Sequence, residues 1–379
     1  MNSASDKLHA LLDARMASWS GIGRYTTGLI RALDARDDLK LTILASSDAR
    51  QIIEVGGKLK NIDYIDATAN PLLPAGTHEL TTTYLQSSAD LLHCLHFCAP
   101  SRNLLQRPIV ATIHDLIPLA VPASMPNPFK RIVYKRKIGH TLQTACQIIT
   151  PSQTTADDIQ KYFPQAQIPI RIVAEAADDF GTEPLLQPSI SYPYLLAMGN
   201  TKAHKNLDLL IKVMRKLGLS HSGIKLLLVG DTDEQWLGKQ QKLFPQIRQH
   251  VHFTGAITDE QLRGYYAGAQ AFLYPSLHEG FGLPPVEAAK FGIPVLTANI
   301  GAPSEVMGGA VLALDPHDAQ AWISAIAKIL SDKHYAQQLG QKAQLHAQSF
   351  NWAKTAATTV AVYQEACNIT VKPPSLIRT

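Results

Sequence analysis

Two glutamates eight positions apart, Glu279 and Glu287, bracket the segment EGFGLPPVE. An apolar run (271–276) precedes it and a helix-like run (287–292) follows it, which indicates a strand, a glycine turn and a helix. The N–H groups of a first helical turn can bind an anion, and carboxylates accept hydrogen bonds from hydroxyls. The segment therefore predicts a site for a phosphate and a polyol together, as a sugar nucleotide offers.

Each residue type in this segment has an expected place. Gly280 and Gly282 tolerate positive φ and let the backbone approach a ligand, because they lack Cβ. Pro284 and Pro285 suit the first helical positions, where a missing N–H costs nothing. We expect Glu287 inside the first turn, so that the two glutamates flank a phosphate-sized gap.

A lysine is the next candidate. Lys205 lies six residues after Gly199 and follows the strand-like run YLLAMG. At the carboxyl end of a parallel strand its ammonium could neutralise a diphosphate leaving group, although a solvated loop lysine is the plainer interpretation. His204 precedes it, and the ordinary pKa of histidine allows protonation near a diphosphate without requiring it.

Two further candidates lie in the first half of the chain. The segment SGIGR (20–24) follows the first strand-like run and opens a helix, but a GxG turn alone is a weak indication of phosphate binding. His114 ends the run PIVATIH and could accept a hydrogen bond from a sugar hydroxyl, although a histidine at a strand end is more often structural. Asp115 could orient the imidazole or cap the following turn.

Two motifs suggest metal binding but have plainer interpretations. Asp231 and Asp233 spell DxD, yet after the strand-like run KLLLVG a turn or a helix cap is the better interpretation. The run HCLHFC (93–98) has zinc-capable residue types, but alternation along a strand would point them to opposite faces. We therefore expect no metal site.

The basic segment PFKRIVYKRKIGH (128–140) allows two interpretations. It mixes five basic residues with apolar ones, so as a helix it could lie on an anionic membrane surface or near a lipid diphosphate. A solvated helix with a buried apolar stripe is equally consistent with the pattern. Both interpretations stay open.

The composition is that of a soluble globular protein. The 379 residues are 46% apolar and 17% charged, unlike a disordered chain, and the apolar runs are too short for a membrane span. The amino terminus lacks the apolar core of a signal peptide, so we expect a cytoplasmic protein, and its four cysteines are expected to be reduced. The net charge of +4 is too weak to indicate nucleic acid.

Strand-like and helix-like runs alternate along the chain, which predicts an α/β fold with doubly wound parallel sheets. Two series of runs are separated by a stretch rich in Pro, Gly and Ser (178–193), which we interpret as a linker. We expect Rossmann-like domains at residues 1–180 and 193–350, and a final helix and tail (351–379) returning to the first domain. Such halves predict a ligand cleft between them, facing the carboxyl ends of both sheets.

The chain resembles family 4 of the nucleotide-sugar glycosyltransferases, which have the GT-B architecture. The resemblance implies an acceptor-side domain followed by a nucleotide-sugar donor domain. The chain departs from the family's habit at His204, where arginine is common, so one certain cation remains instead of two. The resemblance covers nearly the whole chain and is carried by EGFGLPPVEAAKFGIPVLTA (279–298), GNTKAHKNLDLLI (199–211), VHFTGAITDEQLRGYYAGAQAFLYPS (251–276), SWSGIGRYTTGLIRAL (18–33) and TIHDLIPL (112–119).

The resemblance also implies roles for single residues. Glu287 would bind the ribose hydroxyls, while Glu279 and His114 would approach the transferred sugar. Lys205 would stabilise the departing diphosphate, which makes His114, Lys205 and Glu279 the expected catalytic residues. The other positions expected to contact the nucleotide sugar are Gly21, Ile22, Gly23, His204, Gly230, Gly255, Ile257, Gly280, Phe281, Gly282 and Leu283.

By resemblance, the protein is a retaining hexosyltransferase that requires no cofactor and no essential metal. Two of its motifs look most like those of bacterial mannosyltransferases that build lipopolysaccharide O-chains or exopolysaccharide, so GDP-mannose is the expected donor, ahead of GDP-rhamnose and UDP-sugars. The expected acceptor is a hydroxyl of a lipid-diphosphate-linked saccharide, which would bring the chain to the inner face of the cytoplasmic membrane. The alternatives are a sugar-nucleotide epimerase, an α-glucan phosphorylase, and a non-catalytic GT-B protein that binds glycan or nucleotide within an assembly complex.

Overall fold

The computed structural model describes residues 7–55, 57–100, 107–177, 190–220 and 223–368. The chain divides into two compact units, and each is described by itself. The first unit holds the described residues up to Leu119, then Asn127–Ala176, and those from Asn351 onward. The second unit holds Ala120–Pro126 and the described residues between Ala177 and Phe350. The linker expected at 178–193 lies almost wholly outside the described residues.

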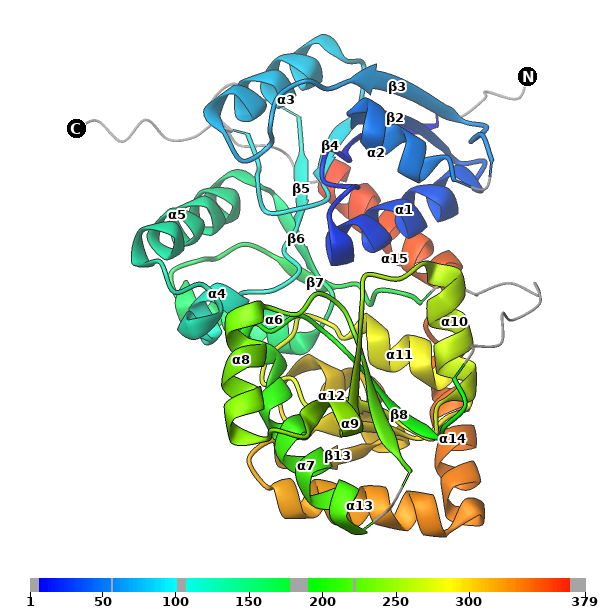
Figure 1. Cartoon of the computed structure of the whole chain (residues 1–379). Coiled ribbons are helices and arrows are strands. Elements are labelled where there is room, and N and C mark those ends of the chain that lie inside the picture. Colours follow the sequence, from blue (N-terminus) through cyan, green and yellow to red (C-terminus); the bar gives the residue numbers. More distant parts are fainter. Residues whose placement is uncertain (1–6, 56, 101–106, 178–189, 221–222, 369–379) are drawn as a thin grey trace. The chain divides into compact units, whose positions relative to one another are not determined.

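A seven-stranded parallel sheet forms the centre of the first unit, with the strand order β3-β2-β1-β4-β5-β6-β7 (Figure 1). The order reverses between β1 and β4, as in a doubly wound sheet. The strands are β1 (Leu8–Asp13), β2 (Leu39–Ala45), β3 (Ile62–Asp66), β4 (Leu91–Cys94), β5 (Ile109–Thr112), β6 (Gln147–Thr150) and β7 (Ile170–Ile172).

Helices pack against both faces of this sheet and form a hydrophobic core with each. Along β1, Ala10 and Leu12 enter one core with residues of α1 and α15, whereas Leu11 enters the other with residues of α3, α5 and α6, because side chains alternate along a strand. In Figure 1 the red helix α15 lies beside the blue helix α1, with which it is in contact. The helices are α1 (Ser20–Asp34), α2 (Ser47–Ile53), α3 (Pro74–Gln86), α4 (Ile117–Ala120), η2 (Pro122–Ser124), α5 (Pro128–Thr144), α6 (Gln153–Tyr162) and α15 (Trp352–Asn368).

A six-stranded parallel sheet forms the centre of the second unit, with the order β10-β9-β8-β11-β12-β13. Here the order reverses between β8 and β11. The six strand-like runs expected in the second half are all strands, so the prediction of two doubly wound parallel sheets is confirmed. These strands are β8 (Tyr194–Met198), β9 (Lys225–Val229), β10 (Val251–Gly255), β11 (Phe272–Tyr274), β12 (Val295–Ala298) and β13 (Leu312–Leu314).

The helices of the second unit alternate with its strands. One core packs α7, α9 and α13 against β8 and β9, with Trp322 fully buried among them. Within the described residues, none of the helices is long and apolar enough to cross a membrane. The helices are η3 (Ala203–Lys205), α7 (Leu207–Ser220), α8 (Glu234–Leu243), α9 (Ile247–His250), α10 (Asp259–Gly268), α11 (Leu283–Lys290), α12 (Gly301–Met307), η4 (Gly308–Ala310), α13 (Ala319–Ser331) and α14 (Lys333–Ala347).

Candidate functional site

The structure brings Lys205 and Glu279 together at the point where the strand order of the second sheet reverses. Lys205 follows β8 and Glu279 follows β11, and these two strands are neighbours. The Nζ atom of Lys205 donates a hydrogen bond to Oε1 of Glu279 at 2.7 Å. Doubly wound sheets bind ligands outside the carboxyl ends of the strands at this reversal, so the pair lies where a ligand is expected.

Neighbouring residues fix the geometry of this ion pair. Lys205 Nζ also donates to the hydroxyl of Tyr274 at 3.1 Å, and Ser276 Oγ donates to Glu279 Oε1 at 2.6 Å. Asn206 follows the lysine in the left-handed conformation, with φ of 50°. Its amide donates to the carbonyls of Pro275 and Pro316, which stabilises a backbone conformation that few residues other than glycine adopt. These hydrogen bonds fix the backbone turn that carries Lys205, and with it the direction in which the lysine side chain extends.

The ion pair is charged despite its burial. Burial acts to lower the pKa of Lys205, but the Glu279 carboxylate outweighs this effect and raises it. Burial likewise acts to raise the pKa of Glu279, and the positive charge of Lys205 reverses this and lowers it. Each partner therefore keeps the other ionised at neutral pH.

His204 is a neutral, buried side chain. It is 5% exposed, and burial lowers its pKa to about 4. Its backbone carbonyl accepts from Leu277, but its Nδ1 atom has no hydrogen-bond partner in the described structure. A buried polar atom without a partner is costly. His204 is thus no second cation at pH 7, and its Nδ1 is an unsatisfied atom buried from solvent.

The glycine turn before α11 differs in detail from the expectation. Gly282 has a positive φ, 99°, and a Cβ there would lie 2.9 Å from Cγ of Pro303. The space that this glycine leaves is therefore occupied by the protein itself. The side chains of Phe281 and Leu283 are buried, and the Phe281 ring packs edge-on against Phe350.

The expectation that Glu287 lies in the first turn of the helix is wrong. α11 begins at Leu283, so Glu287 is its fifth residue and belongs to the next turn. Pro284 and Pro285 fill the second and third positions and have no N–H, so of the first three helical residues only Leu283 offers an amide donor. The amino terminus of α11 is a weaker anion site than the sequence suggested.

Glu287 is nevertheless held in a defined position. It is 2% exposed, and its Oε2 atom accepts a hydrogen bond from the hydroxyl of Tyr266 at 3.0 Å. Tyr266 belongs to α10 and is itself fully buried. The carboxylate is therefore a fixed acceptor, as a ribose-binding role requires.

Glycines with positive φ end three neighbouring strands of the second sheet. They are Gly199 after β8, Gly230 after β9 and Gly255 at the end of β10, with φ of 155°, 126° and 69°. A Cβ at Gly230 would lie 2.7 Å from the carbonyl oxygen of Gly199, so no larger residue fits there. Ile257 is half-buried and directly precedes Thr258, the N-cap of α10. The amides of Gly199 and Gly230 donate to the carbonyls of Val229 and Gly255, so backbone hydrogen bonds join these strand ends.

In the first unit, the GxG segment is the first turn of α1. Gly21 and Ile22 are the second and third residues of the helix, and its N-cap, Trp19, makes no side-chain cap. The amide of Gly23 already donates to the Trp19 carbonyl, and a Cβ at Gly23 would lie 2.3 Å from the carbonyl oxygen of Ala17. Unlike α11, α1 has no proline in its first turn, so the amides of Gly21 and Ile22 remain potential donors.

His114 is fixed by Glu175, and of the two roles expected for Asp115 the structure shows the turn cap. The Nδ1 atom of His114 lies 3.0 Å from Oε1 of Glu175, and its Nε2 lies 2.9 Å from the carbonyl oxygen of Leu95. Asp115 accepts from the amide of Ile117 and so caps the following turn. Both ring nitrogens of His114 face acceptors, an arrangement that favours the doubly protonated imidazolium.

The electrostatics of His114 agree with this protonation. Burial acts to lower its pKa, but the hydrogen bond and the charge of Glu175 reverse this and raise it. The ring of Tyr25 packs edge-on against the imidazole at 4.7 Å between centroids. The hypothesis that His114 accepts a hydrogen bond from a sugar therefore does not fit this arrangement.

A buried ion cluster next to α1 was missed by the sequence reasoning. Asp13, the last residue of β1, accepts from Nε and Nη2 of Arg15, both at 2.8 Å, and its Oδ2 lies 3.0 Å from Nε2 of His96. The amide of Cys98 donates to Nδ1 of His96, so Nε2 carries the ring proton. Arg15 also contacts Glu79 at 3.1 Å. The sequence feature that could have indicated this cluster is the pair Asp13 and Arg15 directly after an apolar run.

The two metal-like motifs have structural roles. Asp233 is the N-cap of α8 and accepts from the amide of Trp236 at 2.8 Å, as the cap interpretation predicted. His93 lies in β4 with Nδ1 2.7 Å from the Tyr363 hydroxyl and Nε2 2.8 Å from Thr112 Oγ1. Across the described residues, no cluster of three His, Cys, Asp or Glu side chains could hold a metal ion.

The two sheets, with Lys205 and Glu279 at the reversal of the second, define a protein of the GT-B class. A sucrose-phosphate synthase from Thermosynechococcus elongatus shares this fold with a TM-score of 0.73 and 20% identity, over 95% of this chain and 98% of that one. Anabaena HepE in complex with UDP and glucose shares it with a TM-score of 0.69 and 17% identity, over 94% and 100%. These likenesses concern the fold alone.

Two family models together match most of the chain. Residues 19–179 match the model described as Glycosyltransferase Family 4, and residues 188–346 match the one described as Glycosyl transferases group 1. The chain belongs to this family of glycosyltransferases, as the motifs predicted.

Similar proteins of this family are named as mannosyltransferases. The serotype-specific mannosyltransferase WbdA of Escherichia coli is 29% identical over 262 residues, which are 65% of this chain and 32% of WbdA. The O-antigen chain mannosyltransferase B of Escherichia coli is 28% identical over 291 residues, 72% of this chain and 74% of that protein. The match therefore spans about a third of WbdA and about three quarters of the second relative.

Proposed function

We propose that this protein transfers a hexosyl group from a nucleotide sugar to a hydroxyl of a saccharide. The observation that carries the proposal is the ion pair of Lys205 and Glu279, 2.7 Å apart and largely shielded from solvent at the reversal of the second sheet. Lys205 would stabilise the negative charge that develops on the leaving diphosphate. Among the described residues, Lys205 and Ser276 both donate to Oε1 of Glu279, so Oε2 is the atom that would accept from the sugar.

In this mechanism the other residues hold the donor. Glu287, fixed by Tyr266, would accept hydrogen bonds from the ribose hydroxyls. His114, as an imidazolium held by Glu175, would contribute positive charge. Because the protein supplies these charges itself, the proposal needs no cofactor and no essential metal.

We propose GDP-mannose as the donor, with retention of anomeric configuration. The support is the similarity to proteins named as mannosyltransferases and the family resemblance of the motifs. GDP-rhamnose or a UDP-sugar is the alternative, since HepE was solved with UDP and glucose. The proposed acceptor is a lipid-diphosphate-linked saccharide of an O-antigen or related polysaccharide, at the inner face of the cytoplasmic membrane.

The test compares GDP-mannose, GDP-rhamnose and UDP-glucose by isothermal titration, by product mass and by the anomeric coupling of the product. We expect GDP-mannose to bind and react, with a panel of lipid-diphosphate saccharides as acceptors. Glu287→Gln should weaken donor binding at least tenfold, whereas Glu260→Gln, an exposed change in the first turn of α10, should not. Reaction with UDP-glucose alone would refute the mannosyl donor.

A non-catalytic binding role is the competing function. It predicts that a nucleotide sugar binds but is neither transferred nor hydrolysed, with any acceptor of the panel. Donor hydrolysis or transfer that disappears in Glu279→Gln would exclude this role.

A further inference from the structure

Helix α5 exposes apolar side chains at its amino-terminal half. Phe129 is 77% exposed, Ile132 48% and Val133 51%. They are spaced by three and four positions, so they lie on one face of the helix. Single exposed apolar residues are ordinary on protein surfaces, but three on one helical face form a patch, which typically marks an interaction site. We call these three residues the apolar patch.

The same helix carries five cations and no acidic residue. They are Lys130, Arg131, Lys135, Arg136 and Lys137. The opposite face of α5 is anchored in the unit, because Ile138 and Leu142 are buried and the hydroxyl of Tyr134 donates to the carbonyl of Asp115.

A buried apolar stripe thus exists, but it does not account for the apolar patch. The open interpretation of a solvated helix explains one face of α5 only. The outward face combines apolar residues with charges of a single sign, which is the composition of helices that lie in a membrane interface.

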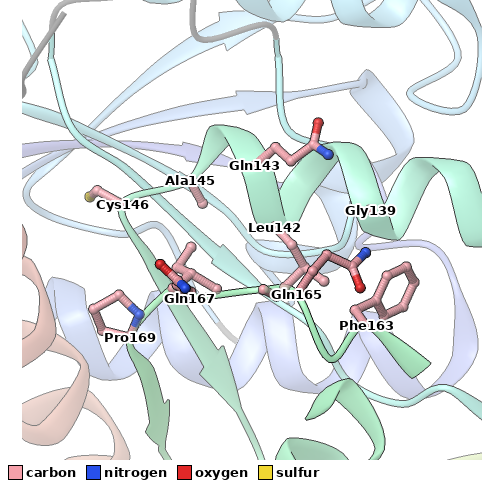
Figure 2. A pocket seen from close by; sticks show the side chains of 11 residues that line it. Gly139, Leu142, Gln143, Ala145, Cys146, Phe163, Gln165, Gln167 and Pro169 are labelled. Atoms are coloured by element: carbon pink, nitrogen blue, oxygen red, sulfur yellow. The ribbon is translucent and has the colours of Figure 1, made fainter. Parts of the chain in front are cut away.

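The surface beside the patch is hollowed. A depression of about 680 Å³ is lined by Ile132, Lys135, Arg136 and His140 of α5 and by residues 162–165. A second hollow of about 410 Å³ follows farther along the helix, where Figure 2 shows Gln143 of α5 among its lining residues. Pockets of this size take small ligands, and the cations at the first hollow suit a phosphate.

We propose that the amino-terminal half of α5 docks on a bilayer that contains anionic phospholipid. The apolar patch enters the boundary between headgroups and acyl chains, and the cations meet lipid phosphates, one of which occupies the hollow at Lys135 and Arg136. The amino end of α5 is preset for this contact, because Asn127 caps it by accepting from the amides of Phe129 and Lys130. This surface would hold the enzyme at the membrane where the proposed lipid-linked acceptor lies, and in that respect the docking role rests on the proposed function.

The test is flotation of the full chain with vesicles of phosphatidylcholine alone or with 30 mol% phosphatidylglycerol (roughly a bacterial anionic fraction). We expect binding at least tenfold stronger to the anionic vesicles, and weaker at high salt. The triple variant Phe129→Ser, Ile132→Ser, Val133→Ser should lower it at least tenfold. Arg136→Glu should lower it as well, with little change of fold because the side chain is exposed.

Leu345→Ser is the matched control, because Leu345 is 69% exposed on α14 and lies outside the patch. Equal binding to both vesicle types, or full binding by the triple variant with its wild-type thermal transition, would overturn the proposal. Capture of an acidic protein by α5 without vesicle binding would also overturn it.

Transfer to a short soluble acceptor is measured in parallel, without vesicles. Loss of vesicle binding with intact transfer in the triple variant supports the docking role. Absence of transfer with normal vesicle binding refutes the proposed function and leaves the docking surface standing.

Discussion

The two units build the carboxyl edge of a parallel sheet from different materials. In the first unit, side chains project there and pair with one another, as Asp13 does with Arg15 and His114 with Glu175. In the second unit, strands end in glycines with positive φ such as Gly199 and Gly230, beside the single ion pair of Lys205 and Glu279 described above. Glycines without Cβ allow a ligand to approach the backbone closely, whereas the first edge presents side chains that already pair with one another.

This difference separates two kinds of sensitivity. The side chains at the first unit's edge form hydrogen bonds and ion pairs with one another. Replacing them should therefore first change the stability of the fold and its dependence on pH. Substitutions at the glycines of the second edge, or in the Lys205–Glu279 pair, should instead change donor affinity and turnover. Four predictions follow this division, from the largest effect to the smallest.

The largest effect is expected at Lys205. Lys205→Ala leaves Glu279 buried without its cation, so we expect a loss of turnover of about 10²- to 10³-fold and a loss of stability of about 3–5 kcal/mol. The kcat with saturating donor and the free energy of unfolding in urea measure the two losses. Lys202→Ala, an exposed lysine of the same turn, is the control. Wild-type kcat in Lys205→Ala would remove the lysine from the chemistry.

Gly230 and Gly21 should respond in opposite ways. Gly230→Ala forces a Cβ against the carbonyl of Gly199 at a φ of 126°, so it should destabilise the fold by about 1–3 kcal/mol. Gly21→Ala meets nothing within 4 Å and lies in a helix, so stability should stay or rise. If the amides of α1 bind phosphate, the KM of the Gly21→Ala variant for the donor should still increase. An unchanged KM would restrict donor binding to the second unit.

Glu175→Gln should lower the pKa of His114, because the negative charge that helps to raise it is removed. In the wild type the folded pKa lies above the unfolded value of about 6.5. The contribution of the pair is therefore complete below pH 6.5 and is lost as the pH rises through the folded pKa. NMR titration of the imidazole and the pH dependence of Tm measure the change.

His93 is the internal reference for this titration. Burial lowers its pKa to about 3, so it destabilises the fold as the pH falls from about 6.5 toward 3, the opposite sign. An unchanged titration of His114 in Glu175→Gln would mean that the glutamate does not set its charge.

The smallest effect is expected at Tyr266. Tyr266→Phe removes the hydrogen bond to Glu287 and keeps the ring, so we expect a loss of about 1 kcal/mol in donor binding or stability. Calorimetric titration of the donor and thermal unfolding distinguish the two. A loss of affinity equal to that of Glu287→Gln would show that the carboxylate must be held in place to act.

The sequence predicted what depends on local pattern. The alternating runs indicated both sheets, and Lys205 and Glu279 each follow a strand, β8 and β11, as expected. That these two strands are neighbours was not predicted. The strand β3 was missed because it is a half-exposed edge strand in which acidic and apolar residues mix. Glu287 was assigned to the wrong turn because residue types do not show where a helix begins.

Partners distant in sequence were beyond reach of pattern reasoning. Glu175 lies 61 residues from His114, and His96 lies 83 residues from Asp13. Such pairs depend on which strands become neighbours, and residue types alone do not state the strand order. For the nearby Asp115 the sequence allowed two roles, orienting the imidazole or capping the turn, and the structure shows the cap.

The position of helix α15 in the sequence affects the order in which the two units fold during synthesis on the ribosome. The core of the first unit includes Val360 and Tyr363, and a Cβ at Gly28 of α1 would collide with the ring of Trp352. The second unit is encoded up to Phe350, before any of α15. Synthesis runs from the amino terminus, so the first unit cannot complete its core until α15 has followed the second unit out of the ribosome. We therefore expect the second unit to complete its folding earlier.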